Sequence, residues 1–209
     1  MTFHSDLYAQ ALAGEECWLR RTDGSRRPIP VRQWFHGADS RVDHALVCCC
    51  DGPTVDLGCG PGRLVAALMH RGVAALGIDI SPMAVAVTRS RGAPALQRDV
   101  FDCLPAAGRW EYAILADGNI GIAGDPVRLL GQTRRLLARG GVAIVEFDCP
   151  GIGLVAEQIR LETHSGAGDW FPWARVGIDQ ADRMAAAAGL RMLTTAEVSG
   201  HHIAWLARS

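Results

Sequence analysis

The sequence lacks the features of membrane-spanning, secreted and nucleic-acid-binding proteins. No apolar run approaches the roughly 18 residues that a membrane-spanning helix needs. Met1–Asp6 shows neither the basic segment nor the apolar segment of a secretory signal. The net charge of −1 provides no excess of cations for binding nucleic acid. We therefore expect a cytoplasmic protein that binds neither membranes nor nucleic acid.

The seven cysteines lack the spacing of a metal site or of a disulfide framework. Cys48, Cys49 and Cys50 are consecutive, without the two-residue gap that lets paired thiolates hold one zinc ion, and no second pair follows. An odd number of cysteines without a secretory signal also argues against disulfides. We expect no metal site, and we expect these cysteines to pack as small apolar side chains.

A regular alternation of strands and helices begins at residue 54. The 209 residues suffice for one domain with a substantial core. Short apolar runs predict strands at 54–57, 74–80, 95–98, 112–116 and 142–147. Amphipathic patterns predict helices at 62–71, 82–91 and 125–138. Such alternation is typical of βαβ units, and so of a doubly wound α/β fold whose mainly parallel sheet has helices on both faces.

The flanking segments are less regular. Before the alternation we expect a helix, an extended segment or short strand, and a second helix, at 5–12, 31–35 and about 40–50. After it we expect an amphipathic segment, an aromatic-rich segment and a helix, at 154–163, 169–175 and 178–188. The last two strand-like runs, 192–199 and 202–207, predict an antiparallel pair at the sheet edge.

The segment Val55–Arg63 joins the first predicted strand of the alternation to its first helix. The strand ends in an acid, and Gly58, Gly60 and Gly62 follow at alternate positions. Because glycine has no Cβ, the chain can turn sharply here and a ligand can approach the backbone closely. The helix that follows offers free N–H groups and the positive end of its dipole. This junction indicates a site for a nucleoside-type cofactor.

Acids stand at or just after the ends of four successive predicted strands: Asp56, Asp79, Asp99 and Asp117. In a doubly wound sheet, ligands bind at the carboxyl ends of the strands. Asp79 can accept hydrogen bonds from both hydroxyls of a ribose, and Asp99 with its backbone N–H can bracket the edge of an adenine. An adenine ring can then be held between three apolar side chains, those of Ile80, Met83 and Val100.

The glycine spacing distinguishes between two cofactor classes. The loop has the form G-x-G-x-G and lacks the G-x-G-x-x-G of a nicotinamide dinucleotide site. Asp56, just before the loop, would repel a pyrophosphate, whereas its charge suits an ammonium group. S-adenosylmethionine carries an ammonium, a sulfonium, a ribose and an adenine, and no phosphate. The sequence therefore favours this cofactor, and an NAD(P)-dependent oxidoreductase is the less favoured alternative.

Taken in order, these motifs resemble those of the class I S-adenosylmethionine-dependent methyltransferases, a Rossmann-like family. Val55–Arg63 resembles the first motif, Gly77–Ser81 the second, Arg98–Val100 the adenine-edge position, and Leu136–Phe147 the stretch into the fifth strand. The resemblance covers about residues 50–150 and implies a seven-strand sheet whose last strand is antiparallel. It also implies that the cofactor contacts Asp56, Gly58, Cys59, Gly60, Pro61, Gly62, Asp79, Ile80, Met83, Asp99, Val100, Ala116, Asp117 and Gly118.

The resemblance further implies a division of the chain at residue 50. Residues 1–50 would form a cover of helices and extended segments over the acceptor site, and residues 51–209 would form the cofactor-binding domain. The segment 150–175 would cover the same site. Four aromatic residues of these covers could line an apolar acceptor pocket or pack the cover onto the sheet, and the sequence leaves both open: Trp34, Trp170, Phe171 and Trp173.

Methyl transfer from a sulfonium depends largely on proximity and orientation, and it needs a general base only where the acceptor loses a proton. Asp117, His164 and Glu146 are the catalytic residues that we predict. One further acid and four further histidines are alternative bases: Asp148, His201, His202, His4 and His36.

Three motifs of methyltransferases that act on macromolecules are missing. Asp117–Ile120 stands where nucleic-acid amino-methyltransferases have N/D-P-P-Y/F, and no Pro-Cys nucleophile of a cytosine C5 enzyme occupies that position. The paired-glutamate hairpin of protein arginine methyltransferases is not evident either. We therefore expect methylation of an oxygen or nitrogen of a small organic molecule, by a monomer or homodimer. A non-catalytic cofactor-binding or regulatory module on the same fold is the alternative.

Overall fold

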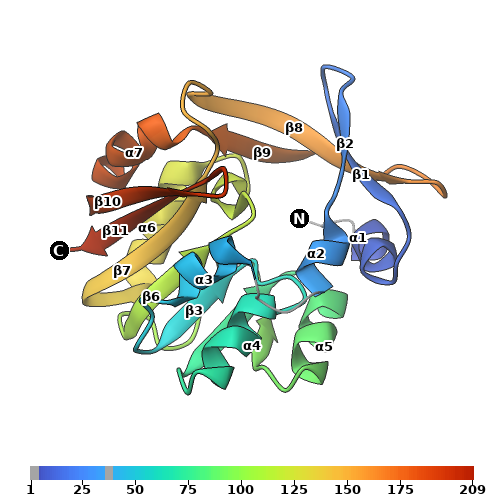
Figure 1. Ribbon diagram of the computed structural model, residues 1–209. Coiled ribbons are helices and arrows are strands. Elements are labelled where there is room, and N and C mark those ends of the chain that lie inside the picture. The colour runs from blue at the N-terminus through green and yellow to red at the C-terminus, as the bar shows by residue number, and fades with distance from the viewer. Residues whose placement is uncertain (1–4, 36–39) are drawn as a thin grey trace.

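Two β-sheets organise the chain in the computed structural model, which describes residues 5–35 and 40–209 (Figure 1). The seven-stranded sheet contains β3 (Thr54–Leu57), β4 (Ala75–Asp79), β5 (Ala95–Gln97), β6 (Trp110–Leu115), β7 (Leu137–Phe147), β10 (Leu190–Val198) and β11 (His201–Arg208). The four-stranded sheet contains β1 (Cys17–Arg21), β2 (Arg26–Pro28), β8 (Leu154–Thr163) and β9 (Phe171–Val176).

The seven-stranded sheet has the order β10-β11-β7-β6-β3-β4-β5. Its five strands from β7 to β5 pair in parallel, as short apolar runs between helices predict. The last strand, β11, is antiparallel to both of its neighbours, with Ala204 opposite Val145. The predicted fold class, and with it the antiparallel pair at the edge, is therefore confirmed.

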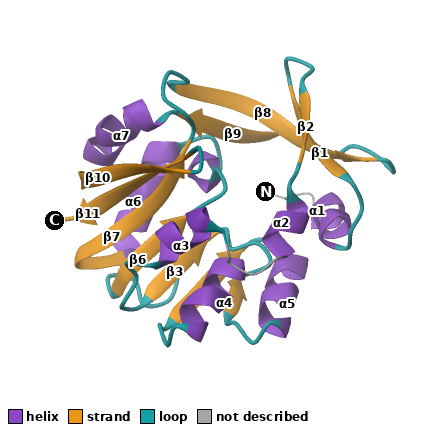
Figure 2. Cartoon of the chain, viewed as in Figure 1, coloured by secondary structure: helices purple, strands orange, loops and turns teal. Residues whose placement is uncertain are grey.

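Helices cover both faces of this sheet (Figure 2). On one face pack α3 (Arg41–Val47), α4 (Arg63–His70) and α5 (Pro82–Ser90), and on the other pack α6 (Pro126–Leu136) and α7 (Ala181–Ala187). Successive residues of a strand point to opposite faces. The neighbours Ile114 and Leu115 are accordingly both fully buried, Ile114 with Leu64 of α4 and Leu115 with Leu129 of α6.

The helix starts follow the predicted capping signals. Ser40 Oγ accepts from Asp43 N–H at 3.0 Å, and Ser81 Oγ accepts from Ala84 N–H at 3.3 Å. Pro82 occupies the first position of α5, where its missing N–H costs no hydrogen bond. Since Ser81 caps α5, the neighbouring Asp79 carboxylate is not needed for that role.

The four-stranded sheet, in the order β2-β1-β8-β9, joins two distant parts of the chain. Arg20 of β1 pairs with Arg160 of β8, and Ile159 of β8 pairs with Phe171 of β9. The helices α1 (Ser5–Leu12) and α2 (Val31–Phe35) lie beside this sheet (Figure 1). The expected extended segment at 31–35 is therefore wrong, because Val31 is buried in a helix that packs with Ala11 of α1.

The described residues also bear on the sequence-based exclusions. Among residues 5–35 and 40–209, no helix is both long and apolar enough to cross a membrane. All seven cysteines are free thiols, of which Cys17, Cys50 and Cys59 are buried and the others are exposed. The expectation of buried packing therefore holds for three of them.

Candidate functional site

The glycine loop after β3 requires glycine at each of its alternate positions. Gly58, Gly60 and Gly62 have φ of 79°, 52° and 78°, in the left-handed region that side chains disfavour. A Cβ on Gly58 would lie 2.6 Å from Asn119 Nδ2, and a Cβ on Gly62 would overlap Thr88. The backbone therefore favours glycine at all three positions, and close packing also excludes a Cβ at Gly58 and Gly62.

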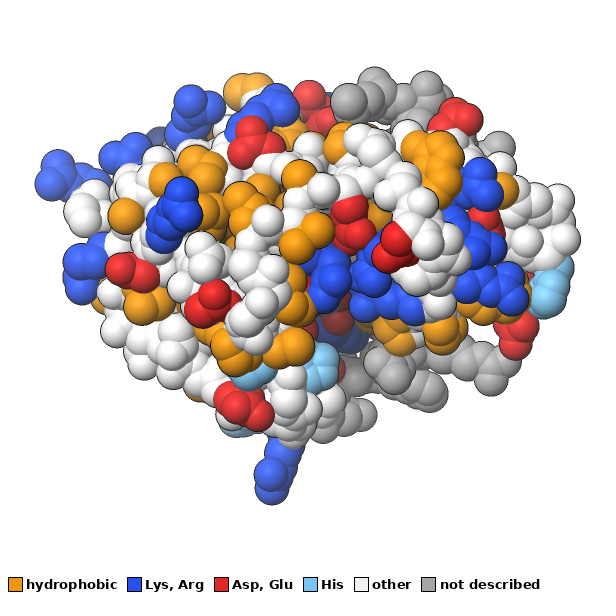
Figure 3. Space-filling view, turned by 90° about the horizontal axis from the view of Figure 1, so that it is seen from above, with side chains coloured by type: hydrophobic (Ala, Val, Ile, Leu, Met, Phe, Trp, Pro, Cys, Tyr) orange, Lys and Arg blue, Asp and Glu red, His pale blue; other side chains and the backbone are white. Residues whose placement is uncertain are grey.

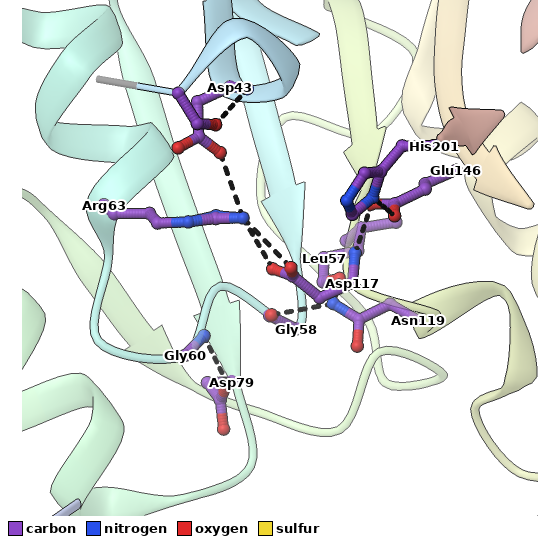
Figure 4. Close-up of polar contacts among 11 residues, drawn as sticks. Asp43, Leu57, Gly58, Gly60, Arg63, Asp79, Asp117, Asn119, Glu146 and His201 are labelled. Carbon is purple, nitrogen blue, oxygen red and sulfur yellow. Dashed lines mark hydrogen bonds and ion pairs between the residues drawn. The ribbon is translucent and has the colours of Figure 1, made fainter. Parts of the chain in front are cut away.

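Hydrogen bonds hold the loop to the end of β4. Gly58 N–H and Cys59 N–H both donate to the Ile78 carbonyl, at 2.8 and 3.0 Å. Asp79 Oδ2 accepts from Gly60 N–H at 2.8 Å (Figure 4), and Asp79 Oδ1 accepts from Ser81 N–H at 2.8 Å. Each carboxylate oxygen keeps a further lone pair. Burial raises the pKa of Asp79, although these N–H donors draw it down.

Asp56 is the second buried acid at the loop, and only 3% of its surface is exposed. Burial raises the pKa of its carboxyl to about 7, the attraction of Arg63 opposes this, and the charges of Asp117 and Asp79 add to it. A cation placed beside Asp56 would favour its ionised form.

Arg63, the first residue of α4, links two further acids. Its Nη2 lies 3.1 Å from Asp43 Oδ1, and it donates to Asp117 Oδ1 and Oδ2 at 3.0 and 2.9 Å (Figure 4). Removal from bulk water raises the pKa of Asp117, and Arg63 opposes this rise. No motif in the sequence marks Asp43 and Arg63 as a pair, because only the packing of α3 on α4 brings them together.

The structure brings Asp117 and Glu146 together. Asp117 has a positive φ of 56°, and its N–H donates to Glu146 Oε2 at 2.8 Å. Glu146 Oε1 lies 2.6 Å from Nδ1 of the half-exposed His201 (Figure 4). Asn119 Nδ2 donates to the carbonyls of Leu57 and Gly58, so the loop after β6 is tied to the glycine loop.

Two aromatic side chains from the N-terminal helices lie over these loops. The Tyr8 hydroxyl is 3.4 Å from where a Cβ on Gly60 would stand. The Tyr8 and Trp34 rings are 6.3 Å apart between centroids, edge to face, and the Trp34 side chain hydrogen-bonds Asp117. Burial, followed by the charge of Asp79, raises the pKa of Tyr8. Sequence reasoning missed Tyr8, whose position on the apolar stripe of a helix looks like ordinary packing.

The structure does not bring His164 to this cluster. It follows β8 at the far end of the four-stranded sheet, its Nε2 lies 3.2 Å from Glu16 Oε2, and its side chain is 72% exposed. Its ring packs edge to face on Trp18. His4 and His36 lie outside the described residues.

The residues predicted to hold an adenine differ in their exposure to solvent. Asp99 forms a turn: its Oδ1 accepts from Phe101 N–H, and its N–H donates to Asp102 Oδ2. Met83 is exposed, Ile80 is half-buried and Val100 is buried in the core. Three other residues predicted to contact the cofactor are buried: Cys59, Pro61 and Ala116. The Cys59 thiol packs against Gly77. Gly118 has a φ of 80°.

Of the cover aromatics, Trp173 also lies against the loop after β6. A Cβ on Gly121 would overlap the Ala174 carbonyl oxygen and would stand 2.8 Å from Trp173 Cδ1. Trp170, in contrast, lies under the Arg160 guanidinium and is exposed. A cavity of about 410 Å³ lies away from all these groups, beside Cys49, Tyr112 and Trp205. We place the candidate site at the loops, where the polar groups converge.

Comparison with known proteins adds an independent line of evidence. Residues 54–141 match the methyltransferase domain family. The magnesium-protoporphyrin O-methyltransferase of Rhodobacter capsulatus is 27% identical over an alignment of 163 residues, which covers 71% of this chain and 59% of that protein. The chain therefore spans less than two thirds of that relative's length.

Two solved structures illustrate the shared fold. An S-adenosylmethionine-dependent methyltransferase from Bacteroides fragilis, in complex with S-adenosylhomocysteine, superposes with a TM-score of 0.78 at 22% identity and covers 97% of this chain and 92% of its own. The 1,6-didemethyltoxoflavin-N1-methyltransferase of Burkholderia thailandensis gives a TM-score of 0.62 at 13% identity, over 85% and 81% of the two chains. The domain match shows a methyltransferase domain over residues 54–141, and the seven-stranded fold and the order of the strand-end motifs are similar to those of the class I S-adenosylmethionine-dependent methyltransferases.

Proposed function

We propose that the chain binds S-adenosylmethionine at the ends of β3, β4 and β6 and transfers its methyl group to an oxygen or nitrogen of a small organic molecule. The observation that carries this proposal is the excess of acidic side chains around a glycine loop that lacks the spacing of a dinucleotide site. The negative charges of Asp117 and Asp79 raise the pKa of Asp56, and the nearby guanidinium of Arg63 forms ion pairs with both Asp117 and Asp43. This field suits a ligand with two cationic groups and opposes the pyrophosphate of a dinucleotide.

The residues at the loop fit such a cofactor. Asp79 is held by two backbone N–H groups and keeps lone pairs for the two hydroxyls of a ribose. Asp56, whose pKa stands at about 7, ionises readily beside an ammonium group. Tyr8 closes the loop surface on the side of Gly60. In the same proposal Asp99 contacts the edge of the adenine, and Val100 packs against its ring.

When bound, the cofactor supplies a methyl group already activated by a sulfonium. The task of the protein is then to orient the acceptor, to exclude water and to take up any proton that the acceptor loses. We assign the proton to Asp117, because partial removal from water raises its pKa and makes it a better base than a fully solvated aspartate. Glu146 is a positioning residue, because it holds the Asp117 N–H. We give His164 no part, since it lies at the far end of the four-stranded sheet and pairs with Glu16.

The acceptor class follows from the same neighbourhood. An O-methyltransferase and an N-methyltransferase of small molecules are among the similar proteins, which supports either atom as the methyl acceptor. Tyr8 and Trp34 support the proposal that the N-terminal segment covers the site. Since β1 pairs with both β2 and β8, the same proposal includes residues 154–176 in the cover.

Calorimetry with S-adenosylmethionine and S-adenosylhomocysteine tests the proposal. We expect both to bind the wild type, and we expect Asp79→Ala to weaken binding at least tenfold, since it removes the ribose acceptor and the support of Gly60. Asp182→Asn, on an exposed position of α7, is the control and should bind normally. Absence of binding to the wild type would refute the proposal, and unchanged affinity in a folded Asp79→Ala would refute the ribose assignment.

A second measurement separates the enzyme from a non-catalytic module. The wild type is incubated with cofactor carrying a radioactive methyl group and with the small-molecule fraction of a cell extract. Transfer of label to a compound other than the cofactor supports the enzyme. Cofactor binding without transfer under any condition favours the module.

A further inference from the structure

Three arginines lie on the inner face of the four-stranded sheet. Directly paired residues of an antiparallel sheet point to the same face. Arg21 pairs with the buried Ile159, and Arg27 pairs with Leu19, which itself pairs with the buried Leu161. Arg175 stands two positions beyond Trp173 and four beyond Phe171, which pairs with Ile159. All three therefore face the seven-stranded sheet.

These arginines share one electrostatic neighbourhood with two acids. Arg21 Nε lies 3.1 Å from Glu157 Oε2, and Arg175 Nε lies 3.6 Å from Asp148 Oδ1. The pKa of Arg27 is lowered, first by partial removal from water and next by the positive charge of Arg21, with a smaller contribution from Arg175. Asp148 and Glu157 oppose this shift. Three guanidinium groups against two carboxylates leave one positive charge uncompensated.

The group also has hydrogen-bonding capacity that is not used. Arg21 Nε is buried and contacts only Glu157 Oε2 among the described residues, without the angle of a hydrogen bond. Arg27 makes no hydrogen bond or close ion pair with any residue in 5–35 or 40–209, and it is exposed to solvent. The donors of the Arg27 guanidinium are therefore available to a ligand oxygen. An incoming ligand can reach Arg27 from solvent.

The outer face of the same sheet differs. There Glu162 accepts from both Arg20 and Arg160, and Arg26 lies 5.0 Å over the Trp18 ring. These basic side chains already have partners within the chain. Figure 3 shows basic side chains gathered across the face that contains the four-stranded sheet, interspersed with acids. Arg27, which has no such partner among the described residues, is turned inward.

The inner group is placed to bind one end of the acceptor. Trp173 packs against Gly121, in the loop that begins with Asp117. Arg175 follows Trp173 by two strand residues, a step of about 7 Å. Asp148 follows β7, the sheet neighbour of β6 that ends before Asp117. The arginines therefore lie at the same end of the seven-stranded sheet as Asp117, beyond the Trp173 ring.

We propose that Arg21, Arg27 and Arg175 form an anion-binding subsite that recognises a carboxylate or phosphate group on the methyl acceptor. The inference rests on the proposed function, because it assigns the anion to the molecule that receives the methyl group. The acceptor then has an anionic group at the arginines, a body against Trp173, and its nucleophilic atom toward Asp117. Planar guanidinium groups suit both oxyanions, because each can donate two parallel hydrogen bonds.

Binding of model anions tests the subsite without turnover. The probes are benzoate, phenyl phosphate and the neutral benzamide, titrated by calorimetry at one ionic strength into protein saturated with S-adenosylhomocysteine. We expect at least one anion to bind the wild type at least tenfold more tightly than benzamide. Arg27→Gln and Arg175→Gln should each weaken that anion at least tenfold. The control Arg26→Gln, next to Arg27 but on the outer face, should bind it as the wild type does.

Each outcome decides the question. A preference for benzoate identifies a carboxylate, and a preference for phenyl phosphate identifies a phosphate. Equal affinity for anions and benzamide, or equal losses in the Arg26 and Arg27 variants, overturns the subsite. S-adenosylhomocysteine affinity, measured first, separates this failure from failure of the proposed function. Arg27→Lys, which keeps the charge, should retain part of the anion affinity and so separates recognition from misfolding.

Discussion

The two sheets hold charge in opposite ways. Asp56, Asp79 and Asp117 stand at the ends of β3, β4 and β6, where Arg63 pairs with Asp117 and attracts Asp56, and removal from water raises the pKa of all three carboxyls. In the four-stranded sheet the arginines outnumber the acids, and hydrogen bonds from Arg20 hold the pKa of Glu162 below its usual range. One sheet thus concentrates negative charge that a cationic cofactor can neutralise, and the other offers positive charge to an anionic ligand.

This contrast teaches that the charged groups of the first sheet reduce stability in favour of binding, whereas those of the outer face of the second sheet support stability. A buried acid with a raised pKa destabilises the fold when ionised, and a paired acid with a lowered pKa stabilises it. The following variants compare the two regions, beginning with the largest expected effect.

Asp56→Asn should change the pH dependence of stability most. Between the ordinary pKa of about 4 for an unfolded aspartate and the folded value of about 7, the folded state keeps a proton that the unfolded state has lost. Wild-type stability should therefore fall through this window as pH rises, by up to about 4 kcal/mol, relative to the variant. Urea unfolding of both proteins at pH 4.5 and pH 8 measures this; a stability difference independent of pH would contradict it.

Gly62→Ala should destabilise the protein by about 3 kcal/mol, because it combines a left-handed backbone with overlap of Thr88. Gly72→Ala is the matched control at the other end of α4: both glycines have a φ of 78°, but nothing lies within 4 Å of a Cβ on Gly72. The control should lose about 1 kcal/mol from backbone strain alone. Chemical denaturation measures both, and equal losses would show that close packing of the loop contributes nothing.

The same contrast explains how much of the fold was predictable. The first sheet follows from local signals: Gly58, Gly60 and Gly62 mark a turn, and Ser81 and Pro82 mark a helix start, each within a few residues. The second sheet depends on distant pairing. Arg20 is a strand residue because it pairs with Arg160, 140 residues later in the chain. The arginine-rich segment around Arg20 has no local pattern that predicts a strand. Val31 likewise becomes helical only in contact with α1.

The candidate site divides in the same way. The meeting of Asp79 with Gly60 follows from adjacent parallel strands, so their order in the sequence already predicts it. Asp43 and Tyr8 reach the site from the N-terminal segment through packing that no motif records. His164 shows the converse case. Its position in the predicted cover suggested a catalytic role, but it lies at the end of β8 that is remote from the site and pairs with Glu16.

Gly121→Ala tests the junction of the two sheets and should cost about 2 kcal/mol by overpacking. Its backbone φ is ordinary, so the cost comes from overlap with the Ala174 carbonyl of β9. Gly131→Ala in α6, where a Cβ meets nothing within 4 Å, is the control and should be stabilising by about 0.5 kcal/mol. Unfolding free energies measure both, and faster amide exchange in β9 of the first variant would locate the damage.

Glu162→Gln should have the smallest effect, about 1 kcal/mol at neutral pH, because its partners remain partly exposed to solvent. The sign of its pH dependence is the opposite of that for Asp56. The folded pKa of Glu162 is lowered, so its contribution is present above the unfolded pKa and is lost as pH falls through the folded one. The stability difference between wild type and variant, measured at pH 7 and near pH 3, should therefore shrink on acidification. A difference that grows on acidification would mean that Glu162 resembles Asp56, and that the two sheets do not hold their carboxylates in opposite ways.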